Sequence, residues 1–180
     1  MRVELLSDNH PVTLFESGVK SLDDWLCHHG LENQKRNLSR VFVLLSDSNE
    51  VLGYYSLTMG GVRKSNLPNS YARGLPAIDI GMVLLARFAV KRTHQGQGIG
   101  RDLLVDAIIR AAHAGEQAAA RFICVDPIDN GARAFYKHFG FKDIEGDEYG
   151  RMYLSIAEAQ AALSQSNSSG LSPKKPDSLS

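Results

Sequence analysis

Cysteine is scarce in this sequence, with Cys27 and Cys124 as the two examples among 180 residues. They do not form a C-x-x-C pair, and His28, His29 and His113 stand at no metal-ligand spacing with a cysteine or a carboxylate. The pattern argues against a disulfide scaffold and predicts no metal site. Free thiols are typical of a reducing compartment, so we expect a cytoplasmic protein.

A net charge and a long apolar run are also absent. The chain has 20 lysines and arginines against 20 aspartates and glutamates, so no global positive field draws it onto nucleic acid. Any basic binding site must therefore be local. No apolar stretch approaches the roughly 20 residues that span a bilayer. The opening stretch MRVELLSDNHPV lacks the apolar core of a signal peptide, and we expect no association with a membrane.

Hydrophobic residues are plentiful, at 43% of the chain, which suits one globular domain with a sizeable core. We place this domain at residues 1–162. The segment 163–180, LSQSNSSGLSPKKPDSLS, is rich in serine, proline and lysine and cannot bury enough apolar surface to order itself. A disordered tail is expected there.

The order of apolar runs predicts a mixed fold. Buried or alternating runs predict strands over 3–6, 40–47, 51–62, 82–90 and 120–127, and a last hairpin over 141–147 and 150–156. Helical spacing predicts helices that begin near Ser21, Ile99 and Asn130. Residues 63–81 are polar and broken by prolines, so a loop is expected. An antiparallel start followed by strand–helix–strand–helix is typical of the α+β class.

The stretch HQGQGIG, residues 94–100, places three glycines at alternate positions between a strand and a helix. A Walker loop needs lysine and Ser/Thr after its last glycine, and a dinucleotide loop needs G-x-G-x-x-G, so both fail on spacing. Gly96, Gly98 and Gly100 would nevertheless expose backbone N–H groups at a helix N-terminus, where anionic phosphate binds. We interpret the stretch as a pyrophosphate cradle. The alternative is a flexible turn that binds nothing.

Side chains around the glycines support the cradle. Gln95 offers a further hydrogen-bond donor, and positive charge stands nearby at Lys91, Arg92 and Arg101.

The glycine stretch resembles the R/Q-x-x-G-x-G/A signature of the GNAT acetyltransferases, with Gln95, Gly98 and Gly100 at the signature positions. A second family landmark, N-x-x-A-x-x-[FL]-Y-x-x-x-G-F, is similar to DNGARAFYKHFGF at 129–141. Asp129 stands where the family usually has asparagine, which leaves open whether Asp129 or Asn130 contacts the coenzyme. The matching residues are Ala132, Phe135, Tyr136, Gly140 and Phe141.

The resemblance implies the GNAT fold. This is an α/β/α sandwich whose mixed, mostly antiparallel sheet is splayed at the site of the cosubstrate acetyl-coenzyme A. It also implies a set of coenzyme contacts on the splayed strand, in the glycine loop and at the second landmark. These are Phe88, Ala89, Val90, Gln95, Gly96, Gln97, Gly98, Ile99, Gly100, Arg101, Asp129, Asn130, Ala132 and Phe135.

A narrower resemblance covers GVKSLDDWLCHHGLENQKRNLSRVFVL, VLGYYSL, LLARFAVKRTHQGQGIGRDLLVDAIIRA and AFYKHFGF. These stretches look like the GNAT-type toxins of bacterial toxin–antitoxin pairs. That group acetylates the α-amino group of the amino acid on charged tRNA and so blocks translation. Its partner is a ribbon-helix-helix antitoxin, and several members are homodimers. Two alternatives stay open: a GNAT enzyme acting on a small amine or a protein N-terminus, and a non-catalytic acyl-coenzyme A-binding module.

The chemistry agrees with an α-amine acceptor. A lysine amine has a pKa of about 10.4, whereas an α-amino group titrates near 7.7–8.0 and needs no strong base. The strand 82–90 carries no Asp or Glu, and the nearest carboxylate before it is Asp79. Tyr136 is the candidate catalytic acid, placed by the resemblance near the coenzyme sulfur. The alternative makes Tyr136 a core aromatic beside Phe139 and Phe141.

Charged tRNA needs local cations. Arg87 differs from the rest because it interrupts an apolar strand, which requires either a packed salt bridge or a substrate contact. The candidates are Lys35, Arg36, Arg40, Arg63, Lys64, Arg73, Arg87, Lys91, Arg92 and Lys137. A solvated surface explains many such residues equally well, while phosphate contacts would make binding fall steeply with salt.

Overall fold

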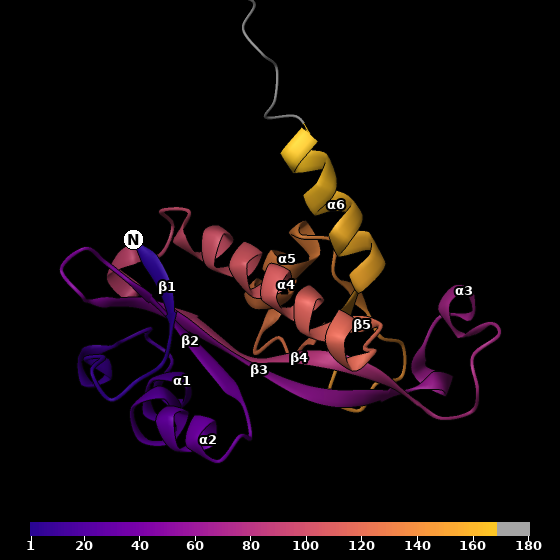
Figure 1. The fold of residues 1–180 in the computed structure, drawn as a ribbon, viewed down its shortest axis with the longest axis horizontal. Helices are drawn as coiled ribbons and strands as arrows, with labels where there is room; N and C mark the ends of the chain where they lie inside the picture. Colours follow the sequence, from indigo (N-terminus) through magenta and orange to yellow (C-terminus); the bar gives the residue numbers. More distant parts are fainter. Residues whose placement is uncertain (169–180) are drawn as a thin grey trace, which may run out of the picture.

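A computed structural model describes residues 1–168, which form a seven-stranded sheet between two layers of helices (Figure 1). The strand order is β1-β2-β3-β4-β5-β7-β6. The strands are β1 Arg2–Leu5, β2 Arg40–Leu45, β3 Val51–Arg63, β4 Asp79–Val90, β5 Phe122–Val125, β6 Lys142–Asp143 and β7 Met152–Ser155. Every neighbouring pair is antiparallel except β4 with β5, as expected for the mixed, mostly antiparallel sheet.

The helices divide between the two faces of the sheet. Figure 1 shows α1 and α2 on one face and α4, α5 and α6 on the other, with α3 at the far end of the β3–β4 hairpin. The helices are α1 Lys20–Trp25, α2 Leu31–Lys35, α3 Asn69–Ala72, α4 Ile99–Ala118, α5 Asn130–His138 and α6 Ile156–Ser168. The prediction of an α/β/α sandwich is confirmed. Within residues 1–168, no helix has the length and apolarity needed to cross a membrane.

Side-chain alternation along the strands separates the core into two faces. Val41 and Val43 of β2 and Tyr54 of β3 pack with Leu22 and Leu26 under α1 and the turn that follows it. Their sequence neighbours point to the opposite face and pack against α4. The second group includes Leu44, Tyr55, Leu57, Leu103 and Leu104.

The sheet opens between β4 and β5. Their parallel pairing runs from Met82↔Phe122 to Leu85↔Val125 and stops there, while β4 continues alone on that side to Val90. On its other edge β4 stays paired with β3, with a bulge between Ser56 and Leu57. The predicted splay is therefore confirmed, and it leaves one backbone edge of residues 86–90 facing an opening.

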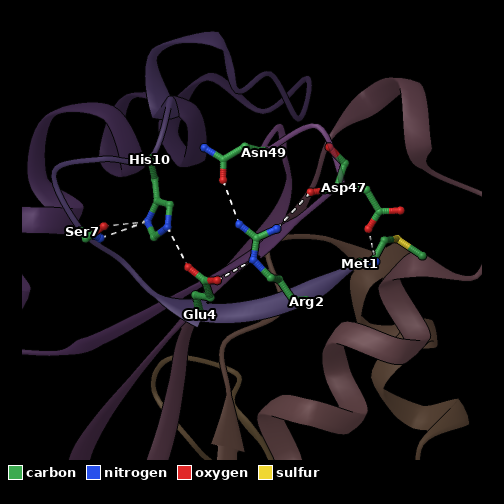
Figure 2. Close-up of polar contacts among 8 residues, drawn as sticks. Met1, Arg2, Glu4, Ser7, His10, Asp47 and Asn49 are labelled. Atoms are coloured by element: carbon green, nitrogen blue, oxygen red, sulfur yellow. Dashed lines mark hydrogen bonds and ion pairs between the residues drawn. The ribbon is translucent and has the colours of Figure 1, made fainter.

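Short polar contacts hold the edge strand β1 to the β2–β3 turn (Figure 2). The Arg2 side chain donates to Glu4 at 2.5 Å and to the Asn49 side chain at 3.0 Å. The Met1 ammonium group pairs with Asp47 at 2.9 Å. Such exposed pairs contribute little stability, but charges along an edge strand hinder pairing with another sheet.

The loop expected over residues 63–81 is shorter than predicted. Antiparallel pairing extends β3 and β4 as far as Arg63↔Asp79, and α3 lies between them. The prolines sit in the connection, while Val62 and Ile80 are buried and continue the strands. Val62 ends the strand that was predicted, whereas the polar composition of residues 63–81 hid Ile80.

The boundary expected at residue 162 is also corrected. Helix α6 runs from Ile156 to Ser168, so the chain is helical past that point. Ile156 and Ala159 are buried with the α4 core, and Glu158 pairs with Lys142 at 2.8 Å. The sequence predicts Ile156 as the end of the last strand, whereas it begins α6, a helix that was not predicted. Residues 169–180 lie outside the described part, and the single-domain assignment stays a prediction.

Ile156 is the main apolar anchor of α6, and we predict that Ile156→Ala lowers the free energy of unfolding by about 2–5 kcal/mol. The side chain is 6% exposed, and a Cβ built on Gly115 of α4 would lie only 2.2 Å from its Cδ1, which shows how tightly it fits. Urea denaturation measures the loss. The matched control is Ile78→Ala, a side chain 61% exposed, which should change stability by less than about 0.5 kcal/mol.

Candidate active site

A cavity of about 580 Å³ lies where β4 and β5 part. One wall is the open edge of β4, and a second is the glycine loop before α4. A third wall is the start of α5 with the residues before it. The segment just before and at the beginning of α1 closes the fourth side. The lining residues are Ser17, Val19, Ser21, Leu22, Leu85–Val90, Gln95, Gly96, Gly100, Asp126, Ile128, Asp129, Gly131, Ala132, Phe135 and Tyr136.

The glycine loop adopts the geometry that its sequence requires. Gly96 and Gly98 have φ of +74° and +84°, a region that side chains rarely adopt, and Gly98 is the N-cap of α4. Within residues 1–168, no protein acceptor takes the backbone N–H groups of residues 96–100. Free amides at the N-terminus of a 20-residue helix favour an anion.

Gly100 has a different role in the same loop. A Cβ there would stand 3.7 Å from both the Phe135 ring and Val90, so the residue sits where α4, α5 and β4 meet. Ile99, predicted as a coenzyme contact, is 7% exposed and packs in the core instead of lining the cavity. Its apolar side chain anchors the first turn of α4, and its backbone N–H stays available.

The Gln95 side chain forms hydrogen bonds with two walls of the cavity. Its Nε2 donates to the carbonyl oxygens of Ser17 and Val90, both at 2.9 Å. Both amide hydrogens are thus used within the protein, so Gln95 fixes the loop rather than offering a donor to a ligand in this structure. Sequence reasoning could not separate the two roles, because Ser17 is remote in sequence.

Two predicted coenzyme contacts lie outside the cavity wall. The Gln97 side chain is exposed and donates to the Thr93 carbonyl at 3.0 Å. Arg101 is exposed and pairs with Asp102 at 3.2 Å. Both stand beside the free amides, so their roles toward a ligand stay predictions.

The second landmark forms the start of α5. Asp129 is the N-cap: its Oδ1 accepts the backbone N–H of Ala132 at 2.7 Å. Capping holds the carboxylate at the helix end, and Asp129 lines the cavity together with Ala132 and Phe135. Asn130 is the first helical residue and does not line it. Which of the two contacts a coenzyme stays a prediction.

Tyr136 is both a core aromatic and a cavity residue. Its ring lies 5.5 Å from Phe135, 5.6 Å from Phe141 and 6.3 Å from Phe88, centroid to centroid. The residue is 6% exposed, yet it lines the cavity, and its hydroxyl bonds no other group within residues 1–168. Burial raises the pKa of the phenol, and the charge of Asp126 raises it further. The phenol therefore stays protonated at neutral pH and can act as an acid.

Arg87 is held by contacts other than a salt bridge. Its guanidinium lies 5.6 Å from the Trp25 ring centroid, and Nη1 donates to the Ala86 carbonyl at 2.7 Å. Trp25 in turn stacks on Tyr54 at 6.0 Å. The stack places a positive charge on the cavity wall beside α1, where it can meet an anionic part of a substrate.

Most other candidate tRNA contacts lie outside the cavity, and several are paired. Lys35 pairs with Asp8 at 3.1 Å, Arg92 with Glu16 at 3.6 Å and Lys137 with Asp143 at 2.8 Å; Lys91 pairs with Glu50, and Lys64 donates to the Leu75 carbonyl. Arg36, Arg40, Arg63 and Arg73 are exposed, and no hydrogen bond or ion pair of their side chains is found within residues 1–168. Their roles toward nucleic acid stay predictions.

The sequence reading missed two parts of the site. Asp126 directly follows β5 and lines the cavity. A carboxylate at the carboxyl end of a parallel strand is a recognisable signal, because ligands collect there in open sheets. The wall formed by Ser17, Val19 and Leu22 carried no comparable signal, since only the folded chain brings it to β4.

A helix N-terminus with unused amides, next to a strand with an open edge, suits a phosphate-bearing carrier with an extended arm. A phenol in the same cavity adds a proton donor. Together these features define a group transferase that takes its group from such a carrier. Residues 37–143 match the family model described as the GNAT acetyltransferase domain, and the chain belongs to that family of acetyl-coenzyme A-dependent enzymes.

Individual relatives agree with the family assignment. A tRNA-acetylating toxin of Mycobacterium tuberculosis is 41% identical over 158 residues, which cover 88% of this chain and 93% of that protein. AtaT complexed with acetyl-methionyl-tRNAfMet has a TM-score of 0.83 at 24% identity, covering 90% of this chain and 98% of that one. A mutant AtaT bound to acetyl-CoA and the C-terminus of the antitoxin AtaR has a TM-score of 0.77 at 23% identity, covering 91% and 98%. At these identities the two structures show the shared fold.

Proposed function

We propose that this enzyme acetylates the α-amino group of the amino acid on charged tRNA and thereby blocks translation as the toxin of a toxin–antitoxin pair. The observation that carries the proposal is the 41% identity to a tRNA-acetylating toxin over 88% of the chain. The cavity supports it, because its open β4 edge, free amides and phenol suit acetyl transfer.

Acetyl-coenzyme A would occupy the cavity in the following arrangement. The free amides of residues 96–100 take the diphosphate, and the backbone of Phe88, Ala89 and Val90 takes the extended arm. Gly96 supports this fit, because no protein atom lies within 4 Å of a Cβ built there and the space in front of the loop is open. When bound, acetyl-coenzyme A supplies a thioester that an amine can attack.

Tyr136 serves as the proton donor to the sulfur that departs. Its hydroxyl is protonated at neutral pH and bonds no protein group within residues 1–168, so its proton is free to transfer. Ser17, Val19, Ser21 and Leu22 line the same cavity on the α1 side. An α-amine acceptor is partly neutral at physiological pH, which suits a site whose central strand carries no strong base.

The tRNA body binds through local cations around the cavity mouth. Arg87 is the cation that lines the cavity itself, and its guanidinium packs on the Trp25 ring. Outlying contacts come from Lys35, Arg36, Arg40, Lys91, Arg92 and Lys137. Paired cations can still contribute, because tRNA phosphates compete with their carboxylate partners. Binding then releases counterions from the tRNA.

The setting and partners follow from the same proposal. The enzyme acts in the cytoplasm, where charged tRNA is found, and is neutralised by a ribbon-helix-helix antitoxin. A homodimer is the proposed oligomeric state. The AtaT structure with the antitoxin AtaR supports a protein partner for a toxin of this fold.

The proposal is tested by incubating the enzyme with acetyl-coenzyme A and a bulk pool of charged tRNA. Mass spectrometry of the released aminoacyl groups should show an added acetyl on the α-nitrogen, and the initial rate should fall steeply between about 50 and 200 mM salt. A polyamine is the competing acceptor. Acetylation of the polyamine with charged tRNA unmodified would contradict the proposal.

A further inference from the structure

Asp126 occupies the point at which the sheet opens. The last register pair of the parallel strands is Leu85↔Val125, so Asp126 and Ala86 are the first residues on either side of the gap. Asp126 is exposed at this position and lines the cavity that also holds Tyr136. The strand register thus places Asp126 where β4 and β5 part, in the same cavity as the proposed coenzyme site.

The carboxylate of Asp126 has no direct partner. Among residues 1–168, no hydrogen bond or ion pair is found for it, whereas Asp129, the other carboxylate of the cavity, caps α5. Asp126 therefore has no capping or turn-forming role that would explain its presence. An unpaired carboxylate in an open cavity favours a cationic ligand.

Two arginines carry positive charge near Asp126 without bonding it directly. Arg151 is held by Asp147 at 2.6 Å, and Arg87 is held on Trp25. Desolvation by neighbouring protein atoms raises the pKa of Asp126, as does the charge of Asp147, whereas the charges of Arg151 and Arg87 lower it. The titratable or charged groups that face Asp126 are Arg87 of β4, Cys124 of β5, Tyr136 of α5, and Asp147 and Arg151 before β7.

We propose that Asp126 receives the ammonium group of the acceptor and takes its proton, opposite the acid Tyr136. The inference rests on the proposed function and names the residue that brings the reacting nitrogen into place. Asp126 attracts the charged form of the α-amine, which is the major form below pH about 7.7–8.0. After proton transfer the neutral nitrogen lies in the gap where β4 and β5 part.

The proton balance of the step is complete. One ammonium proton passes to Asp126 and then to water, which leaves a lone pair on nitrogen. This pair forms the N–C bond to the acetyl carbon, the C–S bond breaks, and the departing sulfur takes the proton of Tyr136. The second proton leaves the acylated nitrogen and restores the phenol. An amide, a thiol and one released proton result.

Asp126→Asn tests the assignment, because the amide keeps the shape but loses the charge and the proton affinity. Initial rates of acetylation of charged tRNA should fall about 10²-fold at pH about 6. At pH about 8.5 the deficit should shrink to within about threefold, because the acceptor is then already neutral. Asp126→Glu restores a carboxylate and should recover at least about tenfold of the loss at the lower pH.

Controls separate this role from folding and from coenzyme binding. Asp47→Asn removes an equal charge on the β2–β3 turn, where the carboxylate pairs with Met1, and should keep the wild-type rate at both pH values. Calorimetric affinity for acetyl-coenzyme A should be unchanged in Asp126→Asn. A deficit equal at both pH values, no deficit, or lost coenzyme affinity would each overturn the inference. Wild-type enzyme inactive on charged tRNA would instead overturn the proposed function, and the inference with it.

Discussion

Tyr136→Phe is expected to lower kcat for acetyl transfer by about 10²- to 10³-fold, the range for loss of a positioned acid. The departing sulfur would lose its proton donor, while the phenyl ring would keep its contacts with Phe88, Phe135 and Phe141. The hydroxyl bonds no protein group within residues 1–168, so its removal leaves no broken hydrogen bond behind. Steady-state kinetics with charged tRNA measures the loss. Calorimetry should give an acetyl-coenzyme A affinity within about twofold of wild type.

Tyr153→Phe is the matched control for this variant. Tyr153 is 2% exposed and packs against Tyr71 and Phe122 at 5.6 Å each, away from the cavity. Removing its hydroxyl should leave kcat unchanged. If Tyr136→Phe retained full turnover, the phenol would be a packing group only, and a non-catalytic binding module would become the better description.

Gly96→Ala is expected to weaken acetyl-coenzyme A binding by about 5- to 30-fold. The residue has φ of +74°, and holding an L-residue there costs about 1–2 kcal/mol. A loop that relaxes to negative φ escapes this cost but turns its amides away from the ligand. Binding then has to restore the strained conformation, which reduces affinity. Isothermal titration calorimetry measures the change directly.

Gly74→Ala is the matched control, because it places alanine at a similar positive φ outside the cavity. Gly74 has φ of +78°, and a Cβ there meets no atom within 4 Å, as at Gly96. Both substitutions place an L-residue at a similar positive φ, so the intrinsic backbone preference they oppose is the same. Only Gly96→Ala should lose coenzyme affinity. Equal affinity in the two would show that the amides of the glycine loop do not hold the diphosphate.

The fold was predictable where the chain has regular apolar patterns. The run from Met82 to Val90 is long and apolar, and the spacing of Leu103, Leu104 and Ala107 is helical, so β4 and α4 were anticipated. The glycine loop was predictable for a related reason. Clustered glycines between a strand and a helix need a left-handed backbone, and the structure shows it at two of the three positions.

Other features depend on contacts between remote segments and left little trace in the sequence. Helix α6 is ordered because Ile156 fits against Gly115, although its own composition is polar. Gln95 looked like a ligand donor and instead bonds Ser17, far away in the chain. The position of Asp126 opposite the splay depends on the parallel pairing of β5 with β4, which joins segments far apart in the chain.

The walls of the cavity come from both sides of the β3–β4 connection. Ser17 and Leu22 precede it, and Val90 and Tyr136 follow it. A chain cut within residues 64–78 would thus yield two fragments, neither of which contains a complete catalytic chamber. β3 would belong to one fragment and β4 to the other, and these two strands form a long antiparallel pair in the intact chain. Activity from two such fragments would accordingly require the β3–β4 pairing to form again between them.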